Sequence, residues 1–177
     1  DDLMAAVGQY NPEPDRDLIS RAFTAACLLH APQQRKSGEA YIHHPVGTAL
    51  NCAELKLDSV TIAAALLHDV VEDTGTPSEW VREQFGEEIE MLVDGVTKLT
   101  KMHFTSREEE QAENYRKMIV AMSTDIRVIL IKLCDRLHNM HTLCYLSKQK
   151  QIQKAKETLE VYAPLAHRLG IHNLKWQ

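Results

Sequence analysis

The sequence predicts a single domain built only from α-helices. Of its 177 residues, 44% are apolar, so the chain can bury a core of ordinary size without disulfide cross-links. Seven glycines and six prolines are too few for an all-β fold, which needs a turn about every dozen residues. Apolar residues recur at helical spacing through most of the chain. We therefore expect about seven helices and no strand, in one domain over residues 1–177.

Apolar stripes predict the helices of the first half of the chain. The third of these helices follows Asp58, a good N-cap residue, and is apolar on nearly every face, so it should lie in the core. A polar loop that contains the breaker Gly38 separates the first two helices. Pro45 suits the first position of the second helix. The three helices are expected over residues 17–29, 45–57 and 59–72, and the loop over 33–44.

Capping sequences mark the helices of the second half. The segment from Thr76 to Glu79 reads as a capping box that starts a short helix, and Gly86 ends it. Another capping box begins at Ser106, Asp125 begins the next helix, and Pro164 should kink the last one. The expected helices after Gly86 span residues 87–99, 106–122, 125–146 and 154–169, with a polar connection over 98–105.

Composition excludes several classes of partner. The net charge of −5 lacks the clustered surplus of Lys and Arg that nucleic-acid binders use to neutralise phosphates. The longest apolar runs are too short to cross a bilayer, and the acidic first residues do not resemble a signal peptide. We expect no nucleic-acid partner, no membrane contact and a cytoplasmic location.

The four cysteines show no CxxC spacing and lie in apolar or helical stretches. This usage is typical of small buried residues in a reducing compartment rather than of disulfides or structural zinc. We expect Cys27, Cys52, Cys134 and Cys144 to be buried thiols.

Ionisable residues interrupt the apolar helix predicted over residues 59–72. His68-Asp69 is followed by Glu72-Asp73, and burying such groups costs several kcal/mol unless they are paired or bound to a metal. Helical spacing places His68 with Glu72 and Asp69 with Asp73 on shared faces. Taken alone, the segment is equally well explained by a helix end that emerges into solvent.

A second polar stripe lies in the apolar helix predicted over residues 125–146. Asp135 is a candidate metal ligand there, and Asn139, one turn later, is a candidate to orient substrate or water. The alternative is a salt bridge from Asp135 to the adjacent Arg136. The pair His43-His44 supplies a further imidazole, and the residues alone do not decide between the two histidines.

The mixed set of imidazoles and carboxylates suits Mn, Fe or Zn better than Mg. A metal ion in such a set lowers the pKa of a bound water, and Glu72 or Asp73 is placed to orient the water or transfer its proton. The HExxH motif, the P-loop and the GxGxxG motif are absent from the sequence. The polar loop over 35–38 is either a phosphate-binding loop or an ordinary exposed charged loop. This pattern predicts metal-assisted hydrolysis.

Five segments occur in order in a match that spans nearly the whole chain: RKSGEAYIHHP at 35–45, HDVVEDT at 68–74, DGVTKLTK at 94–101, KLCDRLHNMHTL at 132–143 and ETLEVYAPLAHRLGI at 157–171. This ordered set closely resembles the hydrolase domain of RelA/SpoT homologues. The resemblance implies an all-α HD-domain phosphohydrolase fold and manganese-dependent removal of the 3′-pyrophosphate from the guanosine alarmones ppGpp and pppGpp.

The resemblance also implies a role for each matching residue. His44 is preferred to His43 because the histidine of the family directly precedes proline. The sequence departs from the usual motifs at Ala40 and His141, and neither is an implied metal ligand. His138, His167 and Arg168 are expected to pack or to support other residues. The implied metal ligands are His44, His68, Asp69 and Asp135; the catalytic pair is Glu72 and Asp73; and the nucleotide contacts are Arg35, Lys36, Ser37, Asn139 and Thr142, with Tyr41 a weaker candidate.

Two other functions stay open. One is an HD phosphohydrolase that acts on another nucleotide, and the other is a catalytically silent regulatory module that binds alarmone. Because residue 1 is not methionine, we expect the chain to be a piece of a longer protein, with synthetase and regulatory domains adjoining it.

Overall fold

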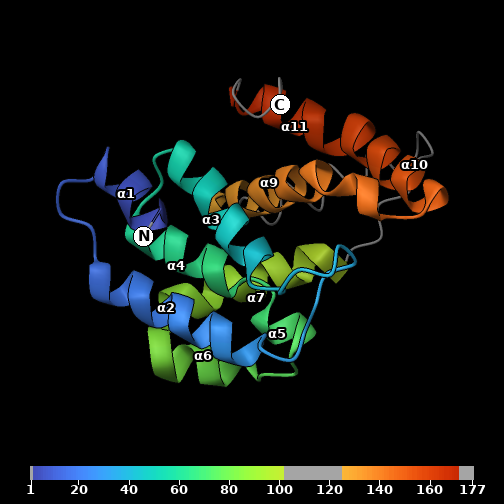
Figure 1. Cartoon of the computed structure of the whole chain (residues 1–177). Helices are drawn as coiled ribbons and strands as arrows, with labels where there is room; N and C mark the ends of the chain where they lie inside the picture. Colours follow the sequence, from blue (N-terminus) through green and yellow to red (C-terminus); the bar gives the residue numbers. More distant parts are fainter. Residues whose placement is uncertain (1, 102–124, 172–177) are drawn as a thin grey trace.

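The computed structural model describes residues 2–101 and 125–171, and it is shown in Figure 1. Within these ranges every regular element is a helix, and the single β-type contact is an isolated bridge between Gln34 and Ala40. The all-α prediction is therefore confirmed. None of the helices described is long and apolar enough to cross a membrane. The helix predicted over 106–122 lies outside the described residues.

Helix α4 forms the centre of the bundle. It packs against four other helices, α2, α3, α7 and α9, and its residues from Thr61 to Leu67 are all buried. Helix α3 in turn packs against α9, so these two helices face each other across the functional region described below. The bounds are Arg16–Leu29 for α2, His43–Glu54 for α3, Ser59–Leu67 for α4, Glu87–Lys101 for α7 and Ile126–His141 for α9.

Shorter helices surround this bundle. In Figure 1 the elements that follow α9 run along one side of the molecule, and the π-helical turn η2 packs against both α9 and α10. Helix α6 packs on α7. The remaining elements are α1 (Asp2–Gly8), α5 (Val70–Asp73), α6 (Ser78–Phe85), the 3₁₀ turn η1 (Leu143–Tyr145), α10 (Lys148–Glu157), η2 (Thr158–Tyr162) and α11 (Ala163–Arg168).

Three predicted helix boundaries are confirmed. The Asp58 side chain accepts a hydrogen bond from Thr61 N at 2.8 Å, so it caps α4. Asp125 caps α9 in the same way, through Arg127 N at 2.8 Å. Gly86 ends α6 with a φ of +93°, a conformation that glycine adopts without strain.

Other boundaries were predicted incorrectly. The expected helix over 59–72 is two helices, with His68 and Asp69 in a turn between them, where His68 Nδ1 bonds to the carbonyl of Ala65 at 2.7 Å. Helix α3 begins at His43, two residues before Pro45, and α9 ends at His141. Helix α1 was not predicted.

The capping box at Thr76 was also predicted incorrectly. The N-cap of α6 is Pro77, which has no side-chain cap, and the Thr76 hydroxyl pairs with that of Thr74 at 2.7 Å instead. The last predicted helix begins earlier, at Lys148, and the π turn η2 directly precedes the segment that contains Pro164. A proline ring removes one backbone donor, and a wider turn beside it accommodates that loss.

The cysteines are all free thiols, but the prediction that all are buried is wrong. Cys52 and Cys134 are buried, Cys27 is half-buried and Cys144 is exposed. Cys144 lies in the 3₁₀ turn that follows α9, beyond the apolar part of the helix that the sequence predicted there.

Candidate metal centre

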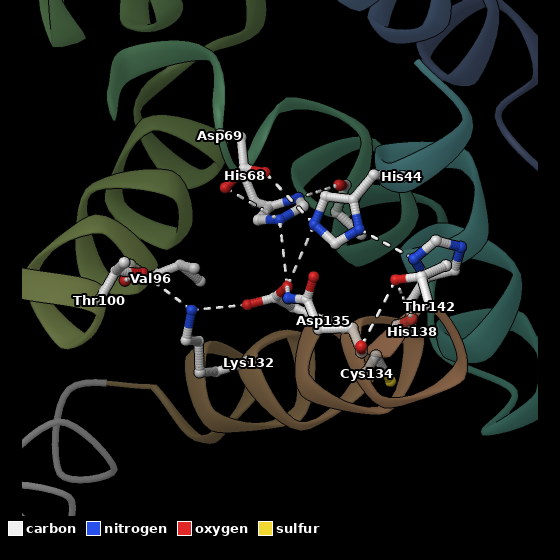
Figure 2. Close-up of polar contacts among 12 residues, drawn as sticks. His44, His68, Asp69, Val96, Thr100, Lys132, Cys134, Asp135, His138 and Thr142 are labelled. Carbon is white, nitrogen blue, oxygen red and sulfur yellow. Dashed lines mark hydrogen bonds and ion pairs between the residues drawn. The ribbon is translucent and has the colours of Figure 1, made fainter. Parts of the chain in front are cut away.

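Three buried side chains from different parts of the chain meet between α3, α4 and α9. His44 comes from the first turn of α3, His68 directly follows α4, and Asp135 lies in the middle of α9. One nitrogen or oxygen atom from each of the three residues lies within 4.8 Å of the others. Figure 2 shows the three side chains pointing toward one another. Their donor set of two imidazoles and a carboxylate is one that holds a divalent transition metal.

His68 provides the clearest sign that the cluster fits a cation. Its Nδ1 bonds to the Ala65 carbonyl at 2.7 Å, so the proton of a neutral ring belongs on that nitrogen. Nε2 is then left with a lone pair, and it is buried without a hydrogen-bond partner. Asp69 Oδ1 lies 3.1 Å away but lacks the alignment that a hydrogen bond needs. A buried, unpaired nitrogen that faces two carboxylates is explained by metal binding.

The two oxygens of Asp135 have different surroundings. Oδ2 accepts a hydrogen bond from Lys132 Nζ at 2.6 Å, and the same ammonium group donates to Thr100 Oγ1 at 2.9 Å. Oδ1 accepts from Asn139 Nδ2 at 2.5 Å and lies 3.1 Å from His44 Nε2. Lys132 thus holds one oxygen, and the other faces the histidines.

The alternative pairing of Asp135 with Arg136 is wrong. Arg136 binds Glu157 at 3.0 Å, and its guanidinium group lies 4.2 Å from the centre of the Tyr162 ring. Arg136 therefore joins α9 to the C-terminal helices. Lys132, three residues before Asp135 on the same helix, is its actual partner, and this spacing was a signal in the sequence that could have identified the pair.

Asp69 lies beside the cluster. Its two oxygens are 3.1 Å from His68 Nε2 and 3.4 Å from His44 Nε2. The Tyr41 hydroxyl lies between two carboxylates, 2.8 Å from Asp69 Oδ2 and 2.5 Å from Asp73 Oδ2. Tyr41 therefore connects the cluster to the acidic pair that the sequence singled out. The role of Asp69 as a fourth ligand stays a prediction.

The charges in the cluster are strongly coupled. Burial opposes a positive charge on His68, but the neighbouring carboxylates of Asp69 and Asp135 raise the pKa of His68 to about 9. Burial also opposes ionisation of the two acids, but His68 lowers the pKa of Asp69 and Lys132 lowers that of Asp135. Two carboxylates thus remain charged, and in the metal-free site Lys132 and a proton on His68 compensate them. A divalent cation that displaces the His68 proton would supply the same compensation.

A cleft of about 280 Å³ opens onto the cluster. Glu72 and Asp73, from α5, lie exposed on its wall, as the predicted catalytic pair requires. Cationic and polar groups that the sequence analysis did not assign to the site also line it. The residues that line this cleft include His44, Asp69, Asp135, Arg35, Tyr41, Asn139 and Thr142, together with Thr100, Lys132, Arg136 and Lys154.

The residues predicted to contact nucleotide gather around a second hollow of about 290 Å³. Arg35 Nη2 donates to Thr142 Oγ1 at 3.0 Å and to Asn139 Oδ1 at 3.3 Å, which joins the polar loop to α9. The two hollows share Arg35, Tyr41, Asn139, Thr142 and Leu146, so they adjoin. All six predicted contacts, Arg35, Lys36, Ser37, Tyr41, Asn139 and Thr142, line this second hollow.

The choice between the adjacent histidines is clear in the structure. His44 is buried in the cluster, and His43 is exposed. His44 Nδ1, on the side of the ring away from the cluster, lies 2.9 Å from His138 Nδ1. Burial and the neighbouring His44 lower the pKa of His138 to about 4, so His138 is a neutral ring at ordinary pH.

Comparison with known proteins agrees with this fold. The family profile described as "HD domain" matches residues 22–172, so the chain belongs to the HD domain family. A solved structure described as "A metazoan ortholog of SpoT hydrolyzes ppGpp and plays a role in starvation responses" superposes with a TM-score of 0.63 at 26% identity. The match covers 84% of this chain and 86% of that one.

Relatives that are longer than this chain show which branch of the HD domain family it belongs to. The chain is 54% identical over 170 residues to a probable guanosine-3′,5′-bis(diphosphate) 3′-pyrophosphohydrolase of Synechocystis, which is 96% of this chain and 22% of that protein. It is 54% identical over 172 residues to a GTP pyrophosphokinase of Myxococcus xanthus, which is 96% of this chain and 23% of that protein. The chain is thus an HD domain of the RelA/SpoT family, and it spans about a quarter of the length of these relatives.

Proposed function

We propose that this chain is a metal-dependent hydrolase that removes the 3′-pyrophosphate from ppGpp or pppGpp and releases GDP or GTP. The observation that carries the proposal is the buried cluster of His44, His68 and Asp135, which opens into a cleft walled by Glu72 and Asp73. The identity of 54% to a relative named for this reaction supplies the substrate class.

Manganese is the metal we propose, with Asp69 as a fourth ligand beside the three clustered residues. Two imidazole nitrogens favour Mn²⁺ over Mg²⁺, which prefers an all-oxygen set. When bound, such an ion lowers the pKa of a coordinated water and polarises a phosphoryl oxygen. The unpaired Nε2 of His68 and the two ionised carboxylates beside it support this assignment.

The acidic pair Glu72 and Asp73 provides the group that accepts a proton from the attacking water. The oxygen of water forms a bond to the phosphorus carried by the 3′-oxygen, and the bond between that phosphorus and the 3′-oxygen breaks. Glu72 or Asp73 accepts a proton from the water, and the departing 3′-oxygen takes up a proton. Tyr41, whose hydroxyl lies within hydrogen-bond distance of both Asp73 and Asp69, fixes the position of Asp73 relative to the cluster.

The second hollow is the proposed site for the guanosine. Arg35 is held by Thr142 and Asn139, so its planar guanidinium group is oriented before substrate arrives. Lys36 and Ser37 lie on the same loop, which a hydrogen bond from Arg35 N to Glu39 O closes at 2.9 Å. The two adjoining hollows then hold the base and the pyrophosphate of one molecule.

One specific observation favours a second candidate. Some relatives of similar identity are named for the opposite reaction, as GTP pyrophosphokinases. In a protein of that kind this region would be a silent module that binds alarmone and regulates an adjoining synthetase domain. Because the chain spans about a quarter of each relative, adjoining domains are part of the proposal. A cytoplasmic location is also part of it, since four free cysteines are typical of a reducing compartment.

The test is to incubate the purified chain with ppGpp and Mn²⁺ and to separate the products by anion exchange. We expect GDP and pyrophosphate in equal amounts, and no product with a chelator or in the variant His68→Ala. Binding of ppGpp without turnover would overturn the hydrolase in favour of the silent module. Faster turnover of another nucleotide under the same conditions would overturn the substrate assignment.

A further inference from the structure

We infer that His138 is a positioning residue that holds His44 in the tautomer needed for metal binding, and that Gly47 provides the space for the His138 ring. The inference rests on the proposed metal-dependent function. Figure 2 shows His138 on the far side of His44 from the cluster, joined to it by one hydrogen bond. The two residues lie 94 positions apart, on α9 and α3.

The hydrogen bond constrains both rings. His44 Nδ1 and His138 Nδ1 lie 2.9 Å apart, and a bond between two imidazole nitrogens needs one donor and one acceptor. A neutral His44 that offers its Nε2 lone pair to a cation must carry its proton on Nδ1. His138 Nδ1 is then the acceptor, so the ring proton of His138 must lie on Nε2.

The two histidines of the cluster are held by acceptors of different kinds. His68 Nδ1 bonds to the carbonyl of Ala65, which can only accept, so the tautomer of His68 is fixed by the backbone. His44 has an imidazole as its partner, and an imidazole nitrogen can either donate or accept. The alignment of His44 therefore depends on a side chain, and a substitution at His138 can remove it.

Gly47 lies one turn after His44 on the face of α3 that meets α9. A Cβ atom at this position would lie 2.0 Å from His138 Cδ2 and 2.2 Å from Nε2. Glycine inside a helix is destabilising relative to alanine. The close approach of the His138 ring accounts for glycine at this position.

The inference is tested by measuring the affinity of the purified chain for Mn²⁺ with isothermal titration calorimetry. His138→Phe keeps a ring but removes the acceptor, so we expect a loss of roughly 10–100-fold in Mn²⁺ affinity, the usual effect of losing a partner behind a ligand. His138→Asn places an acceptor oxygen near the position of Nδ1 and should restore most of that loss. His141→Asn, an exposed histidine on the same helix, is the matched control and should bind like the parent.

The substitution Gly47→Ala, made with and without the His138 ring, tests whether Gly47 acts by making room for that ring or only through general packing of the helices. Gly47→Ala should weaken Mn²⁺ binding in the parent, because the new methyl group displaces the His138 ring. The same change should cost much less in the His138→Ala background, which lacks all of the ring atoms that the methyl group meets. Circular dichroism and thermal unfolding with a chelator present show which variants are folded. Equal losses from Gly47→Ala in both backgrounds would overturn the role of Gly47.

Ring nitrogen NMR of the zinc-loaded chain reads the tautomers directly. We expect His44 to carry its proton on Nδ1 and His138 to carry its proton on Nε2. A proton on His138 Nδ1, or parental Mn²⁺ affinity in folded His138→Phe, would overturn the inference. Loss of ppGpp turnover in a chain with the expected tautomers and normal metal binding would instead count against the proposed function, so the two failures are distinguishable.

Discussion

Lys132 Nζ lies 2.6 Å from Asp135 Oδ2, and both side chains are buried in α9 with one turn between them. Lys132 therefore compensates the charge of Asp135 from one side, while Oδ1 of the same carboxylate faces His44. A buried carboxylate that keeps its charge needs such a partner in the absence of a cation.

Replacing Lys132 with methionine should destabilise the metal-free protein. Removal of one partner of a buried ion pair costs about 3–5 kcal/mol in the free energy of unfolding, because the other charge is left uncompensated. Mn²⁺ supplies positive charge at Asp135, so the loss should be smaller when the metal is bound. Urea unfolding with a chelator and with Mn²⁺ measures both values. Lys98→Met, on an exposed pair, should cost less than about 1 kcal/mol. An identical loss with and without metal would contradict this account.

The adjacent histidines provide a matched pair of variants. His44→Ala removes a clustered imidazole and should weaken Mn²⁺ binding by more than about 100-fold, beyond the loss expected from an outer partner. His43→Ala removes an exposed ring and should leave Mn²⁺ affinity unchanged. Isothermal titration calorimetry compares the two. Equal effects of the two substitutions would show that the cluster is not the metal centre.

The helices that could be predicted are those with local signals. Asp58 and Asp125 are good capping residues, and the segment between Thr61 and Leu67 is apolar on all sides, so neither prediction needed tertiary information. The division between α4 and α5 was missed because it is a turn at His68 and Asp69, which the apolar pattern does not encode.

The candidate site was predictable where polar groups interrupt apolar helices, as His68 and Asp135 do. The choice of His44 over His43 needed either the family resemblance or the orientation of α3, since both histidines precede Pro45 in the sequence. The bond from His44 to His138 joins residues 94 positions apart, and no local spacing reveals such a contact.

Tyr41→Phe distinguishes two roles for this residue. The hydroxyl faces Asp69 and Asp73, so we expect a lower kcat, by roughly 10-fold or more, with little change in KM. Steady-state kinetics with ppGpp measures both constants. Tyr10→Phe, which loses only a bond to the Leu57 carbonyl, is the control. A raised KM with an unchanged kcat would show that Tyr41 acts on the substrate, as the sequence resemblance implied.

Glu72→Gln should separate metal binding from turnover. Glutamine has the size of glutamate but does not accept a proton, so kcat should fall by roughly 10²–10⁴-fold while Mn²⁺ remains bound. Calorimetry for Mn²⁺ and product analysis for ppGpp provide the two measurements. Glu79→Gln, an exposed residue of α6 outside the cleft, should leave both unchanged. Parental turnover in Glu72→Gln would assign the proton transfer to Asp73.

Stability should depend on pH through Asp125, at the start of α9. Its side chain accepts from Arg127 N at 2.8 Å and from the Arg127 guanidinium group, and these bonds, chiefly the latter, lower the pKa of Asp125 below its ordinary value. A folded pKa below the unfolded one, which is about 4, means that the ionised group stabilises the protein above that pH. This contribution disappears as the pH falls through the folded pKa.

Asp125→Ala should therefore cost about 1 kcal/mol or more at pH 7, the usual effect of losing an N-cap. The difference in the free energy of unfolding between this variant and the parent should shrink as the pH falls below about 4, because Asp125 of the parent loses its negative charge there. Asp125→Asn keeps a capping oxygen without the charge, so comparing it with the parent isolates the part that depends on pH. Urea unfolding of all three proteins between pH 3 and pH 7, with a chelator present, measures these differences. A loss of stability in Asp125→Ala that stays constant over this range would show that the bonds to Arg127 contribute nothing through charge.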